Sequence, residues 1–128
     1  MLLNSLYIAE TKSKGRGVFT DKFIEAGSII EIAPVIVLNE KDTEKVHETE
    51  LYYYTFMWSD DNKKGAVVLG YGSVYNHSYE PNCKYETYYE DRLIHFITLR
   101  DIEAGEELTI NYNHDPKDQS ELWFETKI

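Results

Sequence analysis

The sequence predicts a mainly β fold, built from several short strands with little helix. Its apolar stretches are short, rich in Val, Ile and Tyr, and separated by glycine or polar turns, which is typical of strands joined by turns. The tetrapeptide Ile-Glu-Ala-Gly also occurs twice, at 24–27 and 102–105, each time before a strand-like stretch. We expect the same tight turn at both places, with glycine at positive φ; the repeat is too short to indicate a repeat fold.

Taken in order along the chain, the apolar stretches give the expected elements. The expected strands are residues 6–10, 28–38, 51–58, 66–69, 82–89, 93–100 and 107–112, and residues 18–19 form a short apolar segment. Pro34 marks an edge or a bend, and residues 90–92 join the strands at 82–89 and 93–100 into a hairpin. Polar residues 41–48 predict a short helix. The segment 70–78 has no clear period and is expected to be coil with one helical turn.

Length and composition limit the classes of protein. The chain has 128 residues, the size of one domain, and no apolar run long enough to span a membrane. Its start is too short and uncharged for a secretory signal. The single cysteine, Cys83, excludes a disulfide framework and a cysteine-rich zinc module. These features indicate an intracellular protein, in the cytoplasm or the nucleus.

The net charge indicates the kind of partner. Asp and Glu number 23 and Lys and Arg 13, which gives −10. Direct binding to nucleic acid is therefore not expected, because phosphate contacts need Lys and Arg. An acidic surface attracts basic partners, although the charge also serves solubility alone. Eleven tyrosines are explained either by strands or by a pocket for a cationic ligand.

The first unusual segment is 14–19, Lys-Gly-Arg-Gly-Val-Phe. Paired glycines let a ligand approach the main chain closely, although such a pair is also found in ordinary turns. The segment is not a dinucleotide fingerprint, since the third glycine and a βαβ unit are missing, and it is not a phosphate loop, since Gly-Lys-Ser/Thr is missing.

The second segment is 76–83, Asn-His-Ser-Tyr-Glu-Pro-Asn-Cys. The amide of Asn76 both donates and accepts hydrogen bonds, which suits a zwitterionic ligand. His77 could be a base or a metal ligand, but the other histidines are scattered along the chain. A nucleophilic pair of Cys83 with His77 lacks an orienting third residue.

The third segment is 105–112, Gly-Glu-Glu-Leu-Thr-Ile-Asn-Tyr. It is either an edge strand after a turn or a strand that presents the phenol of Tyr112 to a pocket.

In this order the three segments resemble the SET-domain family of protein-lysine methyltransferases, which carries a G-x-G segment, then N-H-S-x-x-P-N, then G-E-E-L-T-x-x-Y. The length is similar to that of minimal viral and bacterial SET proteins. The resemblance implies a SET fold of several small sheets with a C-terminal pseudoknot. It implies a single domain over 1–128, with a core at about 5–115 and a tail at 116–128.

The resemblance also implies site residues and a cofactor, S-adenosylmethionine. Tyr112 would be the catalytic tyrosine, with its hydroxyl at the point of methyl transfer. The residues expected to bind the cofactor are Gly15, Arg16, Gly17, Asn76, His77 and Trp123. Asn76 would hold the methionine part and the His77 backbone the adenine. The expected walls of the lysine channel are Tyr54, Tyr71 and Tyr75.

Two departures from the family pattern matter. Tyr79 stands where many members have a zinc-binding cysteine, and the tail has no cysteine, so we expect no bound metal. Trp123 and Phe124 are the candidates for closing the pockets, or they only dock the tail. Ile110 stands two residues before Tyr112, where members often have Phe or Tyr, so the number of methyl groups added is left open.

The implied activity is methyl transfer to lysine in a basic protein, with a histone tail as the candidate substrate and without membrane or nucleic-acid contact. The alternative within the family is a SET-type module that binds peptide or cofactor without turnover. A third alternative is a β-rich interaction protein with a tyrosine-lined groove and no cofactor. A homodimer that completes the substrate surface is left open.

Overall fold

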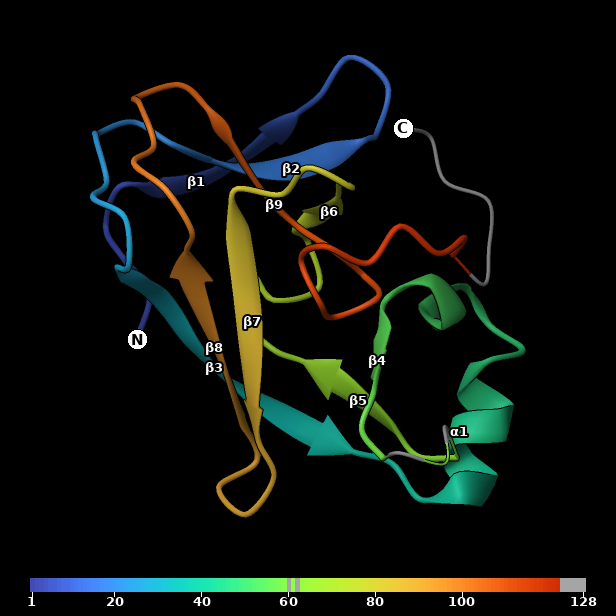
Figure 1. Cartoon of the computed structure of the whole chain (residues 1–128). Coiled ribbons are helices and arrows are strands. Elements are labelled where there is room, and N and C mark those ends of the chain that lie inside the picture. The colour runs from blue at the N-terminus through green and yellow to red at the C-terminus, as the bar shows by residue number, and fades with distance from the viewer. Residues whose placement is uncertain (60, 62, 123–128) are drawn as a thin grey trace.

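The computed structural model describes residues 1–59, 61 and 63–122, and it is built mostly of strands (Figure 1). The elements, in chain order, are β1 (Leu6–Glu10), β2 (Arg16–Thr20), β3 (Ile29–Val37), α1 (Glu40–Val46), the 3-10 helix η1 (Glu50–Tyr53), β4 (Thr55–Met57), β5 (Gly65–Val68), β6 (Asn76–His77), β7 (Cys83–Tyr88), β8 (Leu93–Thr98) and β9 (Glu107–Ile110). The predicted mainly β class is therefore confirmed. No helix in the described part of the chain is long and apolar enough to cross a membrane.

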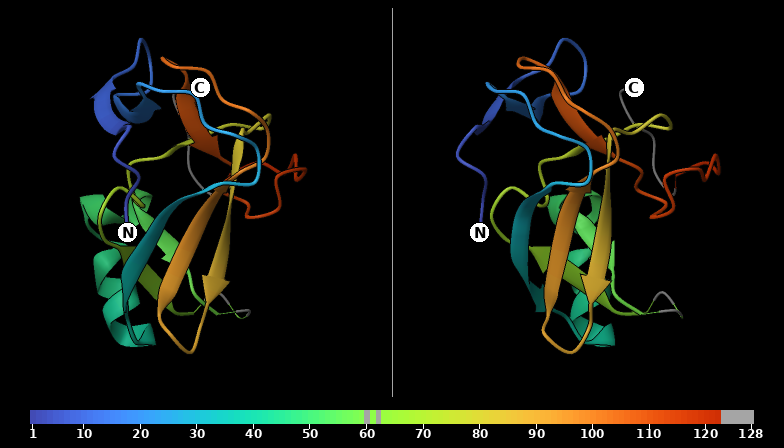
Figure 2. Two further views of the ribbon diagram at one scale, coloured as in Figure 1. Left: turned by 90° about the vertical axis from the view of Figure 1, so that its left-hand side faces the viewer. Right: turned by 60° about the vertical axis from the view of Figure 1, so that its left-hand side comes forward.

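The strands form two sheets. The first has the order β1-β2-β9-β6 and the second β4-β5-β3-β8-β7. Figure 2 shows the first sheet at one end of the molecule and the long strands β3, β8 and β7 extending away from it. Both sheets contribute to one buried core, whose fully buried members include Val18, Ile30, Phe96, Leu108 and Ile110.

Strand β3 changes its neighbour halfway along its length. Residues 29–34 pair with β8, and residues 35–37 pair with β5. Pro34 lies at this change, where its carbonyl accepts from Leu69 N–H at 3.0 Å. The edge or bend expected at Pro34 thus coincides with the point where β3 changes its neighbour.

The two Ile-Glu-Ala-Gly segments lie against one another. Ile24 and Ile102 exchange backbone hydrogen bonds of 2.9 and 2.8 Å. Gly27 has φ +78° and Gly105 has φ +92°, so the predicted turn with glycine at positive φ is confirmed at both places.

Two expected elements differ from the structure. The strand expected at 51–58 is wrong in its first half, because Thr49 caps the 3-10 helix η1 by accepting from Leu51 N–H. This local bond competes with strand pairing despite the tyrosines, and only β4 is extended. The coil expected over 70–78 ends in the short strand β6, because Asn76 and His77 pair with β9.

The predicted helix at 41–48 is present as α1 and supports the neighbouring strands. Asn39 caps it, its side chain accepting from Asp42 N–H at 2.8 Å. Thr43, buried on the inner face of the helix, accepts from Gly65 N–H at 3.0 Å and so joins α1 to β5. This contact holds α1 and the following η1 beside the strands that border the cavity described below.

Candidate active site

The first sheet brings the three sequence segments together. Strand β2 carries Gly17, β9 carries Glu107, and β6 carries Asn76, and in the sheet β9 lies between the other two. Residues separated by more than 50 positions in the chain thereby become neighbours (Figure 1). Sequence spacing alone does not reveal this arrangement, because the β6–β9 pairing is parallel and links distant segments.

A hydrogen-bonded network joins these strands. The Asn76 side-chain Nδ2 donates to the Arg16 carbonyl oxygen at 3.0 Å and to Glu107 Oε2 at 2.7 Å. Glu107 Oε1 lies 3.2 Å from Lys14 Nζ. A Cβ at Gly17 would come within 2.4 Å of Glu107 Oε2, so only glycine fits beside this network.

The other residues of the glycine segment have separate roles. Gly15 has φ +74°, which a glycine adopts without strain. The Arg16 carbonyl is held by Asn76, while its side chain is exposed to solvent. Lys14 and Glu107 were not among the residues predicted for the site, although both lie in or beside the segments singled out. The sequence signal for this pair is a positive charge in the first segment and a negative charge in the third, which can form an ion pair.

His77 is buried and neutral. It is 2% exposed, and its Nδ1 accepts from Tyr112 N–H at 3.0 Å. Burial, and then the charge of Lys14, lowers the pKa of His77 to about 4. The proton of the neutral ring is therefore on Nε2, which is buried without a hydrogen-bond partner among the described residues.

Tyr112 lies two residues after β9, and its phenol reaches the segment before β6. Its hydroxyl donates to the Tyr75 carbonyl oxygen at 2.7 Å. Burial, with smaller contributions from Tyr54 and Glu107, raises the pKa of Tyr112. The phenol therefore stays protonated at neutral pH and acts through hydrogen bonds rather than as a phenolate base.

Tyr75 is fixed by a hydrogen bond to the buried carboxylate of Glu31. Its hydroxyl donates to Glu31 Oε1 at 2.8 Å, and the backbone N–H of Tyr71 donates to Glu31 Oε2 at 2.9 Å. Glu31 is 2% exposed, and burial raises its pKa. Its role was not predicted, because nothing in the sequence distinguishes it from a surface glutamate on a strand.

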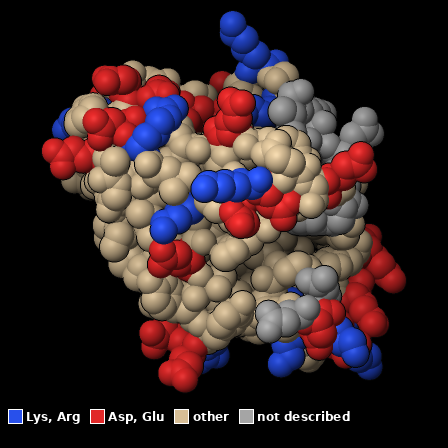
Figure 3. All heavy atoms as spheres, viewed as in Figure 1, with Lys and Arg blue, Asp and Glu red and all other residues tan. Residues whose placement is uncertain are grey.

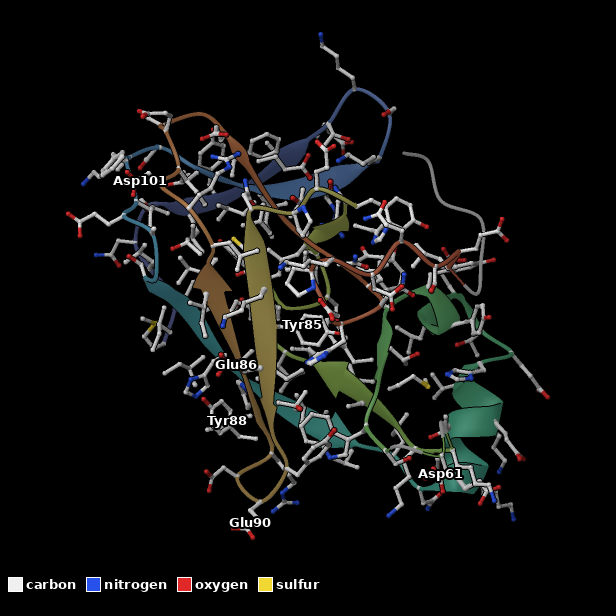
Figure 4. All side chains as sticks on the ribbon, in the orientation of Figure 1. Asp61, Tyr85, Glu86, Tyr88, Glu90 and Asp101 are labelled. Atoms are coloured by element: carbon white, nitrogen blue, oxygen red, sulfur yellow. The ribbon has the colours of Figure 1, made fainter. Side chains whose placement is uncertain are left out.

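A cavity of about 730 Å³ opens beside Tyr112. Seven of its lining residues are tyrosines, among them Tyr54, Tyr75, Tyr85 and Tyr112, and Phe56 adds further aromatic surface. Figure 4 shows Tyr85 projecting from β7, and its ring centroid lies 5.1 Å from that of Phe56 on β4. The cavity is thus bordered by β4, η1, β7 and the segment after β9.

The three tyrosines expected to form channel walls differ in position. Tyr54 lines the cavity and is 44% exposed. Tyr75 also lines it, but its hydroxyl is held by Glu31 and only the rest of the residue faces the cavity. Tyr71 packs against the core and is not among the lining residues. Trp123 lies outside the described residues.

The site residues fit a ligand with the chemistry of S-adenosylmethionine. The hydrogen bonds of the Asn76 amide use its Nδ2, while its Oδ1 has no partner within the described part of the chain. An ammonium group would supply a donor to this oxygen. Gly17 lies directly beside Asn76 and Glu107, so the glycine segment borders the same atoms.

Other chemistries considered for these residues are not supported. Cys83 is fully buried on β7, and burial raises its pKa to about 12, so it is no nucleophile at neutral pH. Among residues 1–59, 61 and 63–122, no group of three or more His, Cys, Asp or Glu side chains could hold a metal ion. The absence of a bound metal stays a prediction.

Comparison with known proteins places these observations in a family context. The family model of the SET domain matches residues 15–113 of this chain. A Schizosaccharomyces pombe protein named histone-lysine N-methyltransferase, H3 lysine-37 specific, is 36% identical over 98% of this chain and 80% of its own length. Human histone-lysine N-methyltransferase 2D is 33% identical over 90% of this chain, which spans only 2% of that protein.

A solved structure agrees with the sequence relatives. The protein is a proposed histone methyltransferase from Plasmodium falciparum, and it superposes with a TM-score of 0.65 at 26% identity. The match covers 86% of this chain and 98% of the other.

Proposed function

Because this chain belongs to the SET-domain family, we propose that it transfers methyl groups from S-adenosylmethionine to lysine side chains of histones. Relatives that match most of the chain are named histone-lysine methyltransferases, and lysine methyl transfer is accordingly its reaction. The observation that carries the assignment of the site is the position of the Tyr112 phenol. It lies between the aromatic cavity and the segment that holds Asn76 and His77.

The aromatic cavity supplies the first requirement of the reaction, a neutral amine. The pKa of a lysine side chain in water is about 10.4, so the amine enters as an ammonium unless its surroundings favour proton loss. The tyrosine and phenylalanine lining removes water from the amine and thereby disfavours the charged form. The proton can leave to water, so the reaction does not require a strong base at this point.

The second requirement is alignment. S-adenosylmethionine, when bound, supplies an electrophilic methyl group on a sulfonium sulfur. The Tyr112 proton is committed to the Tyr75 carbonyl, so the phenol oxygen offers a lone pair to an N–H of the amine. That bond directs the nitrogen lone pair away from the phenol. Positioning of this kind contributes about 7–11 kcal/mol to a reaction between two bound groups.

The cofactor residues are proposed from the geometry already described. Gly17 and Arg16 would offer main-chain contact, Asn76 would bind the methionine part, and the buried His77 would lie beside the adenine. Gly15 shapes the turn through its positive φ. The proposed role of Trp123 concerns a residue outside the described part.

The charge of the protein supports a basic substrate. The net charge is −10, and Figure 3 shows groups of acidic side chains near the edges of one face, with Lys and Arg side chains among them. Electrostatic attraction of a Lys- and Arg-rich tail weakens as salt screens it. A histone substrate also implies a nuclear location, which we propose with it.

Mass spectrometry of core histones incubated with the protein and isotope-labelled S-adenosylmethionine tests the proposal. Labelled lysine is expected in wild type and a near-complete loss in Tyr112→Phe. Cofactor binding by calorimetry with no transfer to any histone or lysate protein would instead support the non-catalytic module. If the protein neither binds the cofactor nor transfers label, only the alternative of a β-rich interaction protein would remain.

Two further predictions have not been tested. One is that residues 1–128 form a single domain with a core at about 5–115 and a tail at 116–128. The other is a homodimer that completes the substrate surface, which sedimentation of the protein with and without peptide would measure.

A further inference from the structure

We propose that Glu107 is a positioning residue that fixes the orientation of the Asn76 amide, so that Asn76 presents only an acceptor to an incoming ammonium group. The inference rests on the proposed function, because the ammonium is that of the methionine part of the cofactor. Glu107 itself need not touch the ligand.

The first step is the count of hydrogens on the Asn76 amide. An asparagine NH₂ group has two. One is directed to the Arg16 carbonyl oxygen at 3.0 Å and the other to Glu107 Oε2 at 2.7 Å. Both acceptors therefore select the same orientation of the amide. Oδ1 is left as the one atom of the amide that is available to a ligand.

The second step is the chemistry that this orientation selects. An ammonium has three donors and no acceptor. It binds Oδ1 favourably, whereas a rotated amide would present NH₂ to it, placing two donors face to face. A fixed Asn76 thus favours a ligand with a primary ammonium over one that lacks it.

The third step is the reason why Glu107 has more influence than Arg16. The bond to the carboxylate is charge-assisted and short, while the bond to the Arg16 carbonyl is between neutral groups. Glu107 is itself fixed: Oε1 lies 3.2 Å from Lys14 Nζ, and the Glu107 carbonyl accepts from Asn82 Nδ2 at 2.8 Å. The side chain is only 17% exposed, so the stability of each variant is measured beside its affinity.

Calorimetry with two thioether ligands tests the inference. S-adenosylhomocysteine carries the amino-acid ammonium, and 5′-methylthioadenosine lacks the amino-acid part. For Glu107→Ala we expect a loss of roughly tenfold in affinity for S-adenosylhomocysteine, the range of one charged hydrogen bond. Binding of 5′-methylthioadenosine is expected to stay within about twofold of wild type, since the glycine segment and His77 are unchanged.

A conservative variant separates positioning from charge. Glu107→Asp keeps the negative charge but withdraws the carboxylate by about one C–C bond, about 1.5 Å, beyond hydrogen-bond reach of Asn76. We expect it to bind S-adenosylhomocysteine as weakly as Glu107→Ala does. Wild-type affinity in Glu107→Asp would mean that the field of the charge acts on the ammonium, and would overturn the positioning role.

The matched control is Glu106→Ala, the neighbouring glutamate, whose carboxylate pairs with Arg100 at 2.9 Å and not with Asn76. Both ligands are expected to bind it as they bind wild type. An equal loss of both ligands in Glu107→Ala would indicate a general structural effect and refute the inference. If Glu107→Ala fails to fold, as judged by thermal unfolding, Glu107→Asp carries the same comparison.

The two levels of failure are distinguishable. Binding of S-adenosylhomocysteine that is equal in wild type and Glu107→Ala would refute only the role of Glu107. Absence of binding of either ligand to the wild-type protein would refute the proposed function and, with it, the inference.

Discussion

The hydroxyl of Tyr112 donates a hydrogen bond of 2.7 Å to the backbone carbonyl oxygen of Tyr75. A side chain just after β9 is thus fixed by the main chain of the segment that leads into β6. Because the Tyr75 hydroxyl donates in turn to Glu31, the direction of the Tyr112 phenol depends on a buried carboxylate on β3.

Tyr112→Phe removes the hydroxyl and keeps the ring, whose centroid lies 5.2 Å from that of His77. We expect kcat to fall by about 100-fold, the usual cost of losing one well-placed polar group at a reacting centre. Binding of S-adenosylhomocysteine should change little. Tyr88→Phe, which removes an exposed hydroxyl on β7, is the control and should retain full kcat. Full kcat in Tyr112→Phe would remove the phenol from the reaction.

Glu31 and Tyr75 should be energetically coupled. Either Glu31→Gln or Tyr75→Phe leaves a buried polar group with one partner fewer, at a cost of about 1–3 kcal/mol in the free energy of unfolding. The double variant should cost less than the sum of the two, by about 1 kcal/mol or more. Urea unfolding of the wild type and the three variants measures this difference. Strict additivity would show that the 2.8 Å contact contributes nothing.

Gly17→Ala should lower cofactor affinity at least about tenfold. The added Cβ would lie 2.4 Å from Glu107 Oε2 and 2.8 Å from Asn76 Nδ2, so both side chains must move. Calorimetry with S-adenosylhomocysteine measures the effect. Gly27→Ala is the control, because it strains a residue at φ +78° but lies outside the site, and stability alone should fall. Unchanged affinity in Gly17→Ala would contradict the close fit.

His77 should make the protein less stable in mild acid. Its pKa is about 4 in the folded protein, against 6.5 for the free side chain, so the unfolded chain binds more protons between these values. Stability from this group is full above about pH 6.5 and falls as the pH falls toward 4. The loss amounts to at most about 3 kcal/mol.

Urea unfolding at pH 7 and pH 5 measures this loss. In His77→Gln the pH-dependent part from this group should disappear, and His95→Gln controls for removing a histidine from the chain. The same pH dependence in His77→Gln as in wild type would show that another group is responsible.

Local sequence was sufficient to predict several separate elements of the fold. The hairpin of β7 and β8, the turns at Gly27 and Gly105 and the helix α1 all follow from short patterns of side-chain type, which local geometry dictates. The exception is η1, where the Thr49 hydroxyl bonds to the backbone and outweighs the strand preference of Tyr52 and Tyr53. A run of tyrosines in the sequence does not distinguish a strand from a 3-10 helix.

The candidate site was predictable only in part. Gly17, Asn76 and Tyr112 lie in recognisable segments, and the structure places them around one centre. Glu31 was not predicted because its role depends on its burial, and no local sequence pattern indicates that this glutamate is buried. Tyr71 was expected beside the cavity, but its side chain packs inward while its backbone serves Glu31. Which face of a turn a side chain occupies is decided by tertiary packing.

The pairing of β9 with both β2 and β6 also orders events during biosynthesis. A ribosome must release residues 107–110 before the hairpin of β1 and β2 can acquire its third strand. Until then, the edge of β2 that pairs with β9 has no partner strand. Catalytic competence and completion of the fold therefore arrive together, in one late step, and a nascent chain halted before Glu107 would possess neither.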